Sequence, residues 1–319
     1  MKAVIYQKYG PPSVLEYVDV PSPQPKSNEL LLKVYATTAN RTDCGFRSAE
    51  YVISRLFSGL LKPKLQILGN EFAGEVVEVG AAVTQYKVGD KIFGFNDTHF
   101  GAYAEYMVLK ETDAFAIIPA GLSYYEAAPI AEGSHYALCD IRPAKVQPGQ
   151  QVLVNGATGA IGSAAVQLLK HFGATVTAVC HSQNMALVKG LGADEVIAYD
   201  KQDFTQLNQQ FDFVFDAVGK SRFSKCKPIL KPKGIYISTE LGPGGENIFL
   251  ALKPYFGGKR LLFPIPTVSK ADVEFLGGLV AAGKFKPVVD RQYPLEQMAE
   301  AHRYAETGMK TGNLVIKVA

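Results

Sequence analysis

Residues 151–173 of the chain read QVLVNGATGAIGSAAVQLLKHFG, a short apolar run followed by glycines and an amphipathic segment. Residues 152–154 are all apolar, which predicts a strand buried on both faces of a sheet. From Ile161 onward, apolar residues recur every three or four positions, which predicts a helix that ends at Gly173. The segment is therefore expected to form a strand, a tight turn and a helix.

The turn of this segment carries Gly156, Gly159 and Gly162. Such a turn directs the free N–H groups and the positive dipole end of a helix toward one point, where a pyrophosphate can bind without a basic side chain. Gly159 would allow close approach of the backbone, and Gly162 would let the helix pack tightly on the strand. Ala157 stands at the first position of the strict G-x-G-x-x-G pattern. Taken alone, the turn is equally compatible with an ordinary strand-to-helix connection that binds nothing.

The sequence after this helix alternates between strand and helix patterns. Strands are predicted at 175–180, 195–199 and 212–216, and a helix at 184–191 that ends at Gly192. This alternation predicts a doubly wound parallel sheet of the Rossmann type, with the glycine turn at the carboxyl end of its first strand. In that context the turn predicts a dinucleotide-binding site.

The length and composition of the chain limit the classes of protein to which it can belong. The 319 residues are enough for two domains, each with its own core. The net charge is only +3 and the basic residues are scattered, which argues against a nucleic acid or a membrane as partner. The cysteines form no C-x-x-C pair, so reduced thiols are expected. The N-terminus MKAVIYQKYG reads as a strand, and no apolar stretch is long enough to cross a bilayer, so we expect a cytoplasmic protein.

Residues 1–119 have a different sequence pattern from the centre of the chain. Short β-branched or aromatic runs between prolines and glycines predict many short strands in a compact, barrel-like domain. These runs lie at 3–6, 29–36, 73–79, 91–93 and 103–108. The tail has a helix pattern from Ala271, strand patterns near 286–293 and 313–318, and a helix pattern after Pro294, and we expect it to rejoin the first domain. The predicted fold is α/β, with one domain at 1–119 and 266–319 and a Rossmann domain at 120–265.

Several segments resemble the medium-chain dehydrogenase/reductase superfamily, and within it the zinc-lacking quinone oxidoreductase and enoyl reductase branch. They are ILGNEFAGEVVEVG at 67–80, KVGDKIFGF at 87–95, GAYAEYMVL at 101–109, the glycine-turn segment, LGADEVIAYD at 191–200, DAVGK at 216–220 and YPLEQMAEAH at 293–302. The resemblance implies a GroES-like, β-rich catalytic domain built from both chain ends. It also implies a Rossmann domain between them and a cleft in which a nicotinamide meets a substrate.

The resemblance also bears on metal binding. Zinc alcohol dehydrogenases of this superfamily carry a cysteine after the third strand and a histidine in a G-H-E motif, because zinc prefers sulfur and imidazole ligands. This sequence has Asn40 at the cysteine position and Gly69-Asn70-Glu71 at the motif, and an amide is a poor zinc ligand. The side chains from which a site could be rebuilt, without the usual ligand spacing, are Cys44, Asp43, Glu71, His99 and His135. We therefore expect no metal, and interpret Cys44 as a small buried residue.

The expected reaction is NADPH-dependent, metal-free hydride transfer to a quinone or an α,β-unsaturated carbonyl compound. Hydride addition to an enone leaves an enolate, which needs a hydrogen-bond donor or a proton source. By resemblance Tyr51 is the substrate-side tyrosine, although it could equally pack its ring under a loop. Asn40 could bond the nicotinamide ribose or carboxamide, or could simply cap a turn. Asp43 and Arg41 are interpreted as a solvated pair, and Glu132, where the family leads us to expect a small residue, has no explanation in the sequence.

The expected cofactor is NADPH. NAD-preferring sites place Asp or Glu after the second strand, whereas here Cys180, His181 and Ser182 follow it. Without a carboxylate to repel a 2′-phosphate, NADPH should bind better than NADH. The glycine turn and the resemblance together predict contacts from Asn40, Ala157, Thr158, Gly159, Ala160, Ile161, Gly162, Cys180, His181, Ser182, Asn184, Tyr199, Ala217, Val218, Gly219, Ser238, Thr239, Leu262 and Phe263.

Other functions and the assembly state remain open at this point. The alternatives are a zinc-independent alcohol dehydrogenase or carbonyl reductase, and a weakly catalytic NADPH-binding protein of the crystallin-like or RNA-binding kind. The tightest basic run, at 225–233, lacks the aromatic residues that RNA binding favours. The resemblance implies a homodimer through the last Rossmann strand, and residues 259–263 fit an apolar edge strand, unless the loop after Pro264 covers it.

Overall fold

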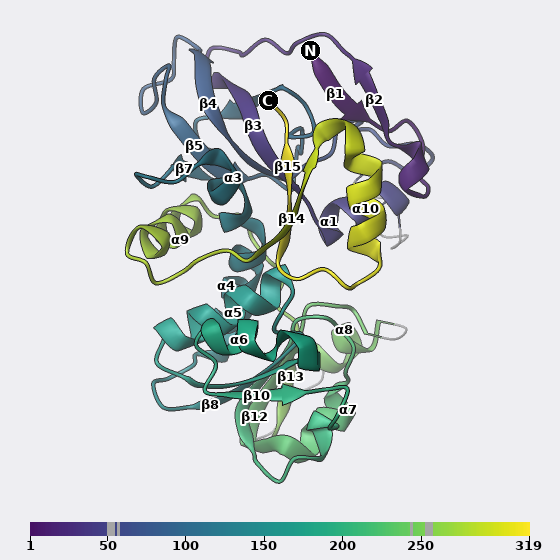
Figure 1. Cartoon of the computed structure of the whole chain (residues 1–319), viewed down its shortest axis with the longest axis vertical. Coiled ribbons are helices and arrows are strands. Elements are labelled where there is room, and N and C mark those ends of the chain that lie inside the picture. Colours follow the sequence, from purple (N-terminus) through teal and green to yellow (C-terminus); the bar gives the residue numbers. More distant parts are fainter. Residues whose placement is uncertain (50–54, 56–57, 243–244, 253–257) are drawn as a thin grey trace. The chain divides into compact units, whose positions relative to one another are not determined.

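The computed structural model describes residues 1–49, 55, 58–242, 245–252 and 258–319. The chain divides into two compact units, of which the terminal unit comprises Met1–Glu132 with Val268–Ala319 and the central unit comprises Gly133–Thr267. Both chain ends belong to the terminal unit (Figure 1). The tail therefore rejoins the first part of the chain. Within the part of the chain that the structure describes, no helix has both the length and the apolar character needed to span a membrane.

The first boundary between the units falls after Glu132, further along the chain than the 119/120 boundary expected from the sequence. The reason is the packing of helix α3 (Tyr124–Ala127) and the 3-10 turn at Ala128–Ile130, which both lie against strands of the terminal unit. The residues of that turn are fully buried. Residues 120–132 thus belong to the terminal unit, and 127–132 are buried in it.

The terminal unit is built on one seven-stranded sheet, in the order β14-β15-β3-β4-β5-β7 with β6 also paired to β3. A separate two-stranded sheet joins β1 to β2. The strands and longer helices are β1 (Lys2–Ile5), β2 (Glu16–Asp19), β3 (Glu29–Ala39), α1 (Arg41–Ser48), β4 (Glu71–Val79), β5 (Lys91–Phe95), β6 (Tyr106–Lys110), β7 (Phe115–Ile117), α9 (Lys270–Ala281), β14 (Val289–Pro294), α10 (Met298–Glu306) and β15 (Asn313–Lys317). This arrangement confirms a GroES-like, β-rich domain built from both chain ends.

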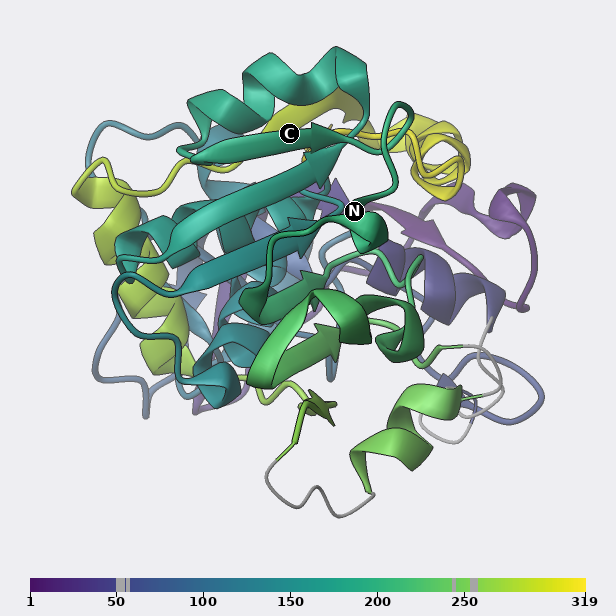
Figure 2. The same cartoon turned by 90° about the horizontal axis from the view of Figure 1, so that it is seen from below.

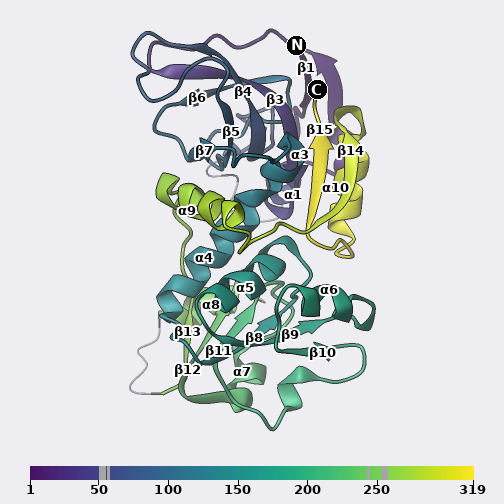
Figure 3. The same ribbon diagram turned by 60° about the vertical axis from the view of Figure 1, so that its left-hand side comes forward.

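Strand β3 organises the sheet of the terminal unit, because it pairs antiparallel with β4, β6 and β15. Its register against β4 shifts between Leu31 and Leu32 and again between Val34 and Ala36. Such irregularities bend a strand, which allows one long strand to serve several neighbours. The C-terminal strand β15 therefore lies directly beside a strand from the first forty residues, as Figures 1 and 3 show.

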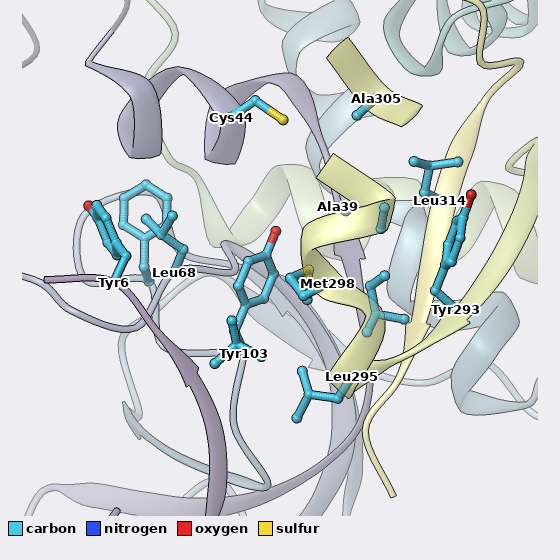
Figure 4. Close-up of a cluster of buried hydrophobic side chains, with 14 of the residues drawn as sticks. Tyr6, Ala39, Cys44, Leu68, Tyr103, Tyr293, Leu295, Met298, Ala305 and Leu314 are labelled. Atoms are coloured by element: carbon cyan, nitrogen blue, oxygen red, sulfur yellow. The ribbon is translucent and has the colours of Figure 1, made fainter. Parts of the chain in front are cut away.

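A hydrophobic cluster lies between α1, α10 and the sheet of the terminal unit. Figure 4 shows most of its buried members, and the hydroxyl group of Tyr103 points toward the helix that carries Cys44. Tyr103 is fully buried, and α10 contributes Met298 and Ala305 to the same cluster. Segments that are about 250 residues apart in the sequence therefore share one core, which fixes α1 in place.

The central unit is a six-stranded parallel sheet in the order β10-β9-β8-β11-β12-β13. Its elements are α4 (Glu132–Ala144, which starts at the boundary), β8 (Gln151–Asn155), α5 (Ala160–His171), β9 (Thr175–Cys180), α6 (Met185–Gly190), β10 (Glu195–Ala198), β11 (Phe211–Asp216), α7 (Phe223–Cys226), β12 (Leu230–Ser238), α8 (Glu246–Ala251) and β13 (Arg260–Leu262). The order reverses between β8 and β11, which is the topological switch point where ligands bind in such sheets.

Helices cover both faces of the parallel sheet (Figures 2 and 3). Helix α5 packs on β8 and β9, and α6 packs on β9 and β10, whereas α7 packs on β12. Because crossovers are right-handed, helices that lead in opposite directions from β8 come to lie on opposite faces. Residues 152–154 are fully buried, and Gly173 adopts φ +80° directly after the end of α5. The predicted Rossmann-type sheet is confirmed.

Candidate active site

The turn after β8 presents the start of α5 in a form that suits an anion. The carbonyl oxygen of Val179 accepts hydrogen bonds from the N–H groups of Gly156 (3.1 Å) and Ala157 (3.0 Å), which holds the turn against β9. Gly159 is the N-cap of α5, with extended backbone and no capping side chain. The first N–H groups of a helix have no carbonyl partner within it. Here they remain available to a ligand oxygen.

The three glycines of the turn have different physical roles. A Cβ atom on Gly162 would lie 2.1 Å from the carbonyl oxygen of Gly156, and one on Gly156 would lie 2.4 Å from Cγ1 of Val218. A Cβ atom on Gly159 would meet nothing nearer than 3.8 Å. Packing therefore requires Gly156 and Gly162, whereas Gly159 leaves open space beside the helix start. That space and the free N–H groups fit the pyrophosphate of a dinucleotide.

The predicted cofactor residues of the central unit gather at one edge of the sheet. All its strands are parallel, so their carboxyl ends meet there. The N–H of Ala217 donates to the carbonyl of Asn155 (3.0 Å), and the N–H of Thr239 donates to that of Asp216 (3.1 Å). The predicted residues at this edge are Ala157, Thr158, Gly159, Ala160, Ile161, Gly162, Cys180, His181, Ser182, Asn184, Tyr199, Ala217, Val218, Gly219, Ser238, Thr239, Leu262 and Phe263. Their contact with a cofactor stays a prediction.

Asp216 organises the loop that follows β11. Its buried carboxylate accepts hydrogen bonds from Asn155 Nδ2 (2.9 Å), the Ser221 N–H (2.8 Å) and the Tyr236 hydroxyl (3.1 Å). These donors come from three different segments of the central unit. The sequence pattern placed Asp216 at the end of a strand but gave no sign of this role.

A carboxylate does stand near the end of β9, although it comes from the next strand. Asp200 follows β10 and accepts hydrogen bonds from the backbone N–H and the hydroxyl of Ser182, both at 2.8 Å. The Ser182 hydroxyl holds the pKa of Asp200 below its usual range, so the group is charged at neutral pH. The expectation that no carboxylate faces this position is wrong, because the pairing of β10 with β9 brings Asp200 beside Ser182.

In the terminal unit, Asn40 and Asn70 form a buried amide pair. Asn40 is the N-cap of α1, and its Oδ1 accepts from the N–H of Asp43 at 2.9 Å. Its Nδ2 donates to Oδ1 of Asn70 at 2.6 Å. Asn40 therefore has the capping role that the sequence left open. Its proposed contact with nicotinamide stays a prediction.

Asp43 is buried, so the interpretation of Asp43 and Arg41 as a solvated pair is wrong. Its carboxyl group accepts from the N–H of Gly69 (3.0 Å) and from the Tyr103 hydroxyl (2.8 Å). Burial raises the pKa of Asp43 to about 7. The hydroxyl of Tyr103 also lies 3.0 Å from Nε2 of His302. This network ties α1 to the loop that carries Asn70.

Tyr51, the predicted donor to the substrate, lies outside the described residues. Its position relative to Asn40 is therefore not part of the observed geometry, and its role stays a prediction. Glu132, which the sequence did not explain, lies buried beside Glu71 in the terminal unit.

Comparison with known proteins identifies the family. Residues 26–120 match the alcohol dehydrogenase GroES-like domain, and residues 191–316 match a model described as zinc-binding dehydrogenase. The chain is 34% identical over 334 residues to the chloroplastic quinone-oxidoreductase homolog of Spinacia oleracea, covering 99% of this chain and 98% of that protein. The chain belongs to the medium-chain dehydrogenase/reductase superfamily, in its quinone oxidoreductase-like branch.

Two further similarities agree with this membership. The quinone oxidoreductase from Coxiella burnetii has a solved structure with a TM-score of 0.90 and 31% identity, covering 100% of this chain and 99% of that one. The chain is also 30% identical to the chloroplastic NADPH-dependent alkenal/one oxidoreductase of Arabidopsis thaliana, over 99% of this chain and 79% of that protein.

Membership in a dehydrogenase superfamily that includes zinc enzymes raises the question of a metal. At the two zinc-ligand positions indicated by the resemblance, this family member has Asn40 and Asn70, whose amides bond to each other. The donor set does not fit zinc, which prefers thiolate and imidazole.

Proposed function

We propose that the protein is an NADPH-dependent oxidoreductase that reduces a quinone or an α,β-unsaturated carbonyl compound without a metal. The observation that carries this proposal is the pair of mutually bonded amides, Asn40 and Asn70, at the positions where related zinc enzymes hold their metal. Without a Lewis acid to stabilise an alkoxide, oxidation of alcohols is disfavoured, whereas reduction of an already polarised acceptor remains feasible.

The central unit offers a suitable place for the dinucleotide. The start of α5 and the open space at Gly159 would hold the pyrophosphate, and the bound cofactor supplies the hydride. The names of the spinach and Arabidopsis relatives support a quinone or an enone as acceptor, and the name of the Arabidopsis relative supports NADPH. Asp200 argues for a modest rather than a strong preference for NADPH over NADH, because its charge would repel a 2′-phosphate.

The chain must also stabilise the charge that appears on the substrate oxygen. We assign this task to the Tyr51 hydroxyl, which would donate a hydrogen bond that strengthens as the enolate forms. Because the oxygen of a reduced quinone is less basic than an enolate oxygen, quinone reduction should depend less on this donor.

The experiment is NADPH oxidation by the wild type and Tyr51→Phe, on an enone and on a quinone, after exhaustive treatment with a chelator. We expect the wild type to keep its activity, and Tyr51→Phe to lose about 100-fold in kcat on the enone and less on the quinone. Activity that disappears with the chelator and returns with zinc would contradict the metal-free reaction. If Tyr51→Phe and the wild type have equal rates on both substrates, Tyr51 does not donate to the substrate and is a packing residue.

The second candidate activity is that of a zinc-independent alcohol dehydrogenase, and turnover of a panel of alcohols with NADP⁺ tests it. Turnover of alcohols but of no enone or quinone would indicate a zinc-independent alcohol dehydrogenase instead. The cytoplasmic location also stays a prediction, since the names of both plant relatives place them in chloroplasts.

A further inference from the structure

Two carboxyl groups of the terminal unit, Glu71 and Glu132, lie buried next to each other. Glu71 is fully buried and Glu132 is 4% exposed. Oε1 of Glu71 accepts the backbone N–H of Glu132 at 2.6 Å, and its Oε2 accepts the hydroxyl of Thr38 at 2.6 Å. The Thr42 hydroxyl donates to Oε1 of Glu132 at 2.7 Å. The acceptor atoms of both groups are thus fixed by short hydrogen bonds from three donors, which lie in β3, in α1 and at the start of α4.

The neighbouring amides have a fixed orientation. Because Oδ1 of Asn40 accepts the N–H of Asp43, its Nδ2 must be the donor, and the atom it faces in Asn70 must be the oxygen. Nδ2 of Asn70 is consequently a second donor, and it makes no hydrogen bond of normal geometry although it is buried. It lies close enough to Glu132 to lower the pKa of that carboxyl. A buried donor without a full hydrogen-bond partner costs folding free energy. The presence of Asn70 therefore indicates that its amide has a role in polar interactions at this site.

The charges around the pair do not neutralise it. Lys310, between α10 and β15, is the cation that faces Glu132, and its Nζ donates to the carbonyl of Gly312 at 2.5 Å. Asp43 of α1 and Asp97 of the loop after β5 face the same region with further carboxyl groups. Burial, and then the charge of Glu132, raises the pKa of Glu71 to about 8, and burial raises that of Glu132. Two acids in such a site titrate as a pair and retain a proton at neutral pH.

We propose that Glu71 and Glu132 hold one proton between them, and that Glu132 releases this proton to the reduced substrate. Glu132 is the outer member of the pair, and its partners Thr42 and Lys310 are only half-buried. This inference rests on the proposed function. A tyrosine is a good hydrogen-bond donor, but its usual pKa of about 10 makes it a reluctant source of the net proton that enone reduction consumes.

The proton transfer accompanies hydride addition to the enone. Hydride from the reduced nicotinamide adds to the β-carbon, the C=C electron pair moves to the carbonyl oxygen, and that oxygen gains a proton. The O–H bond of Glu132 breaks as the new O–H bond forms, either directly or through an intervening hydroxyl. Glu132 is left as a carboxylate that the Thr42 hydroxyl and the Lys310 ammonium stabilise, and solvent restores the proton.

The first test needs no turnover. The infrared spectrum of the cofactor-free protein should contain protonated-carboxyl absorption that disappears as the pH rises from about 6 to about 9. Asp43, whose pKa burial raises to about 7, contributes to it, and Asp43→Asn measures that share; Glu71→Gln or Glu132→Gln should remove the remainder. Asp140→Asn is the matched control, because burial raises the pKa of Asp140 well above its usual range and the residue lies in the central unit. That variant should keep the titrating band. Titrating absorption that is unchanged in both Glu71→Gln and Glu132→Gln would overturn the proposal.

The second test is kinetic. Glu132→Gln, which keeps the size and the Thr42 contact, should lower kcat on an enone about 100-fold with little change in KM, and Glu132→Asp should restore part of the rate. An unchanged enone rate and pH profile in Glu132→Gln would overturn the assignment. Calorimetry with Mg²⁺ and Zn²⁺ on the same proteins gives the competing outcome, since binding lost in Glu132→Gln would make the pair a cation site.

The two proposals can fail separately. If the wild type reduces neither quinones nor enones, the proposed function fails, while the infrared band still decides whether the pair holds a proton. If turnover is found and the titrating absorption is unchanged in both glutamine variants, the proton-holding pair fails alone.

Discussion

At the scale of single residues, Asp200 is the position that should set the choice between NADPH and NADH. Its carboxylate is charged and accepts both donors of Ser182. We expect Asp200→Asn to raise the affinity for NADPH relative to NADH about fivefold, because one negative charge near the expected 2′-phosphate is removed. Fluorescence titration of both cofactors measures the ratio.

Asp194→Asn is the control for this comparison, because Asp194 lies just before β10, at the other end of that strand from Asp200, and pairs with Lys170 at 2.8 Å. It should leave the cofactor ratio unchanged. A stronger preference for NADH in Asp200→Asn would mean that Asp200 supports NADPH through Ser182 instead of opposing it.

Single residues also show where inference from sequence stops. The pattern N-R-T-D suggested that Asn40 could cap a turn, and capping is local, so the structure could confirm it. The partners of Asp43 are Gly69 and Tyr103, which lie 26 and 60 positions away in the chain. No local pattern connects them, so a buried carboxyl was mistaken for a solvated one. Glu132 is similar, because its burial follows from contact with Glu71, 61 positions earlier.

At the scale of elements, two glycine substitutions at the start of α5 should distinguish effects on cofactor binding from effects on stability. Gly159→Ala should weaken cofactor binding at least tenfold without changing the melting temperature, since its Cβ meets no protein atom but fills the space beside the free N–H groups. Gly162→Ala should lower both the cofactor affinity and the melting temperature, because its Cβ would lie 2.1 Å from a backbone oxygen. Calorimetric melting and cofactor titration on the same samples give both quantities.

Gly190→Ala is the control for these variants, since it closes α6 with nothing within 4 Å of its added Cβ. It should match the wild type in binding and be equal or slightly higher in stability. If Gly159→Ala binds NADPH as tightly as Gly190→Ala, the dinucleotide does not pass beside Gly159.

The elements that the sequence predicted are those with a strong periodic pattern. The strand at 175–180 is found with the same bounds, because six β-branched or small apolar residues between two turns allow little else. Strand β2 was missed, since its residues are mostly exposed and form no apolar run. Strand β12 was also missed, because Pro232 and Gly234 interrupt it. Their strand geometry depends on pairing with β1 and β11, which is tertiary information.

At the scale of the whole molecule, the free edge of the parallel sheet bears on assembly. Strand β13 pairs only with β12 in the described sheet, so its other edge carries unpaired backbone groups, and Ile265 beyond it is 82% exposed. An exposed apolar edge invites pairing with another chain. We expect a homodimer in solution, and Ile265→Lys should shift it toward monomer.

Sedimentation at micromolar concentration measures this equilibrium. Val88→Lys, at a position of the terminal unit that is 59% exposed, is the control and should remain dimeric. A monomeric wild type would contradict the dimer, and a dimeric Ile265→Lys would place the contact away from the edge of β13.

The stability of the whole molecule should fall as the pH rises from about 5 to about 8. Burial raises the pKa of Asp43 to about 7 and of Glu71 to about 8, and raises that of Asp140 well above its usual range. A carboxyl group with a raised pKa keeps its proton in the folded chain and loses it in the unfolded chain, so its contribution is full below the unfolded pKa and is lost as the pH rises to the folded pKa. Burial lowers the pKa of His302 to about 3, which acts in the opposite direction but only below about pH 6.5.

Since the carboxyl groups outnumber the single histidine, each pH unit in this window should cost on the order of 1 kcal/mol of unfolding free energy. Urea midpoints at about pH 5, 6.5 and 8 measure the slope. Glu71→Gln should reduce the slope most between pH 7 and 8, where Glu71 titrates and Asp43 has passed its midpoint. Asp203→Asn should leave it unchanged, because hydrogen bonds from Thr205 lower the pKa of Asp203 and confine its effect to acid pH. Stability that rises with pH across the window would mean that the buried carboxyl groups of the folded protein are ionised, and the proton-holding pair would then lose its physical basis.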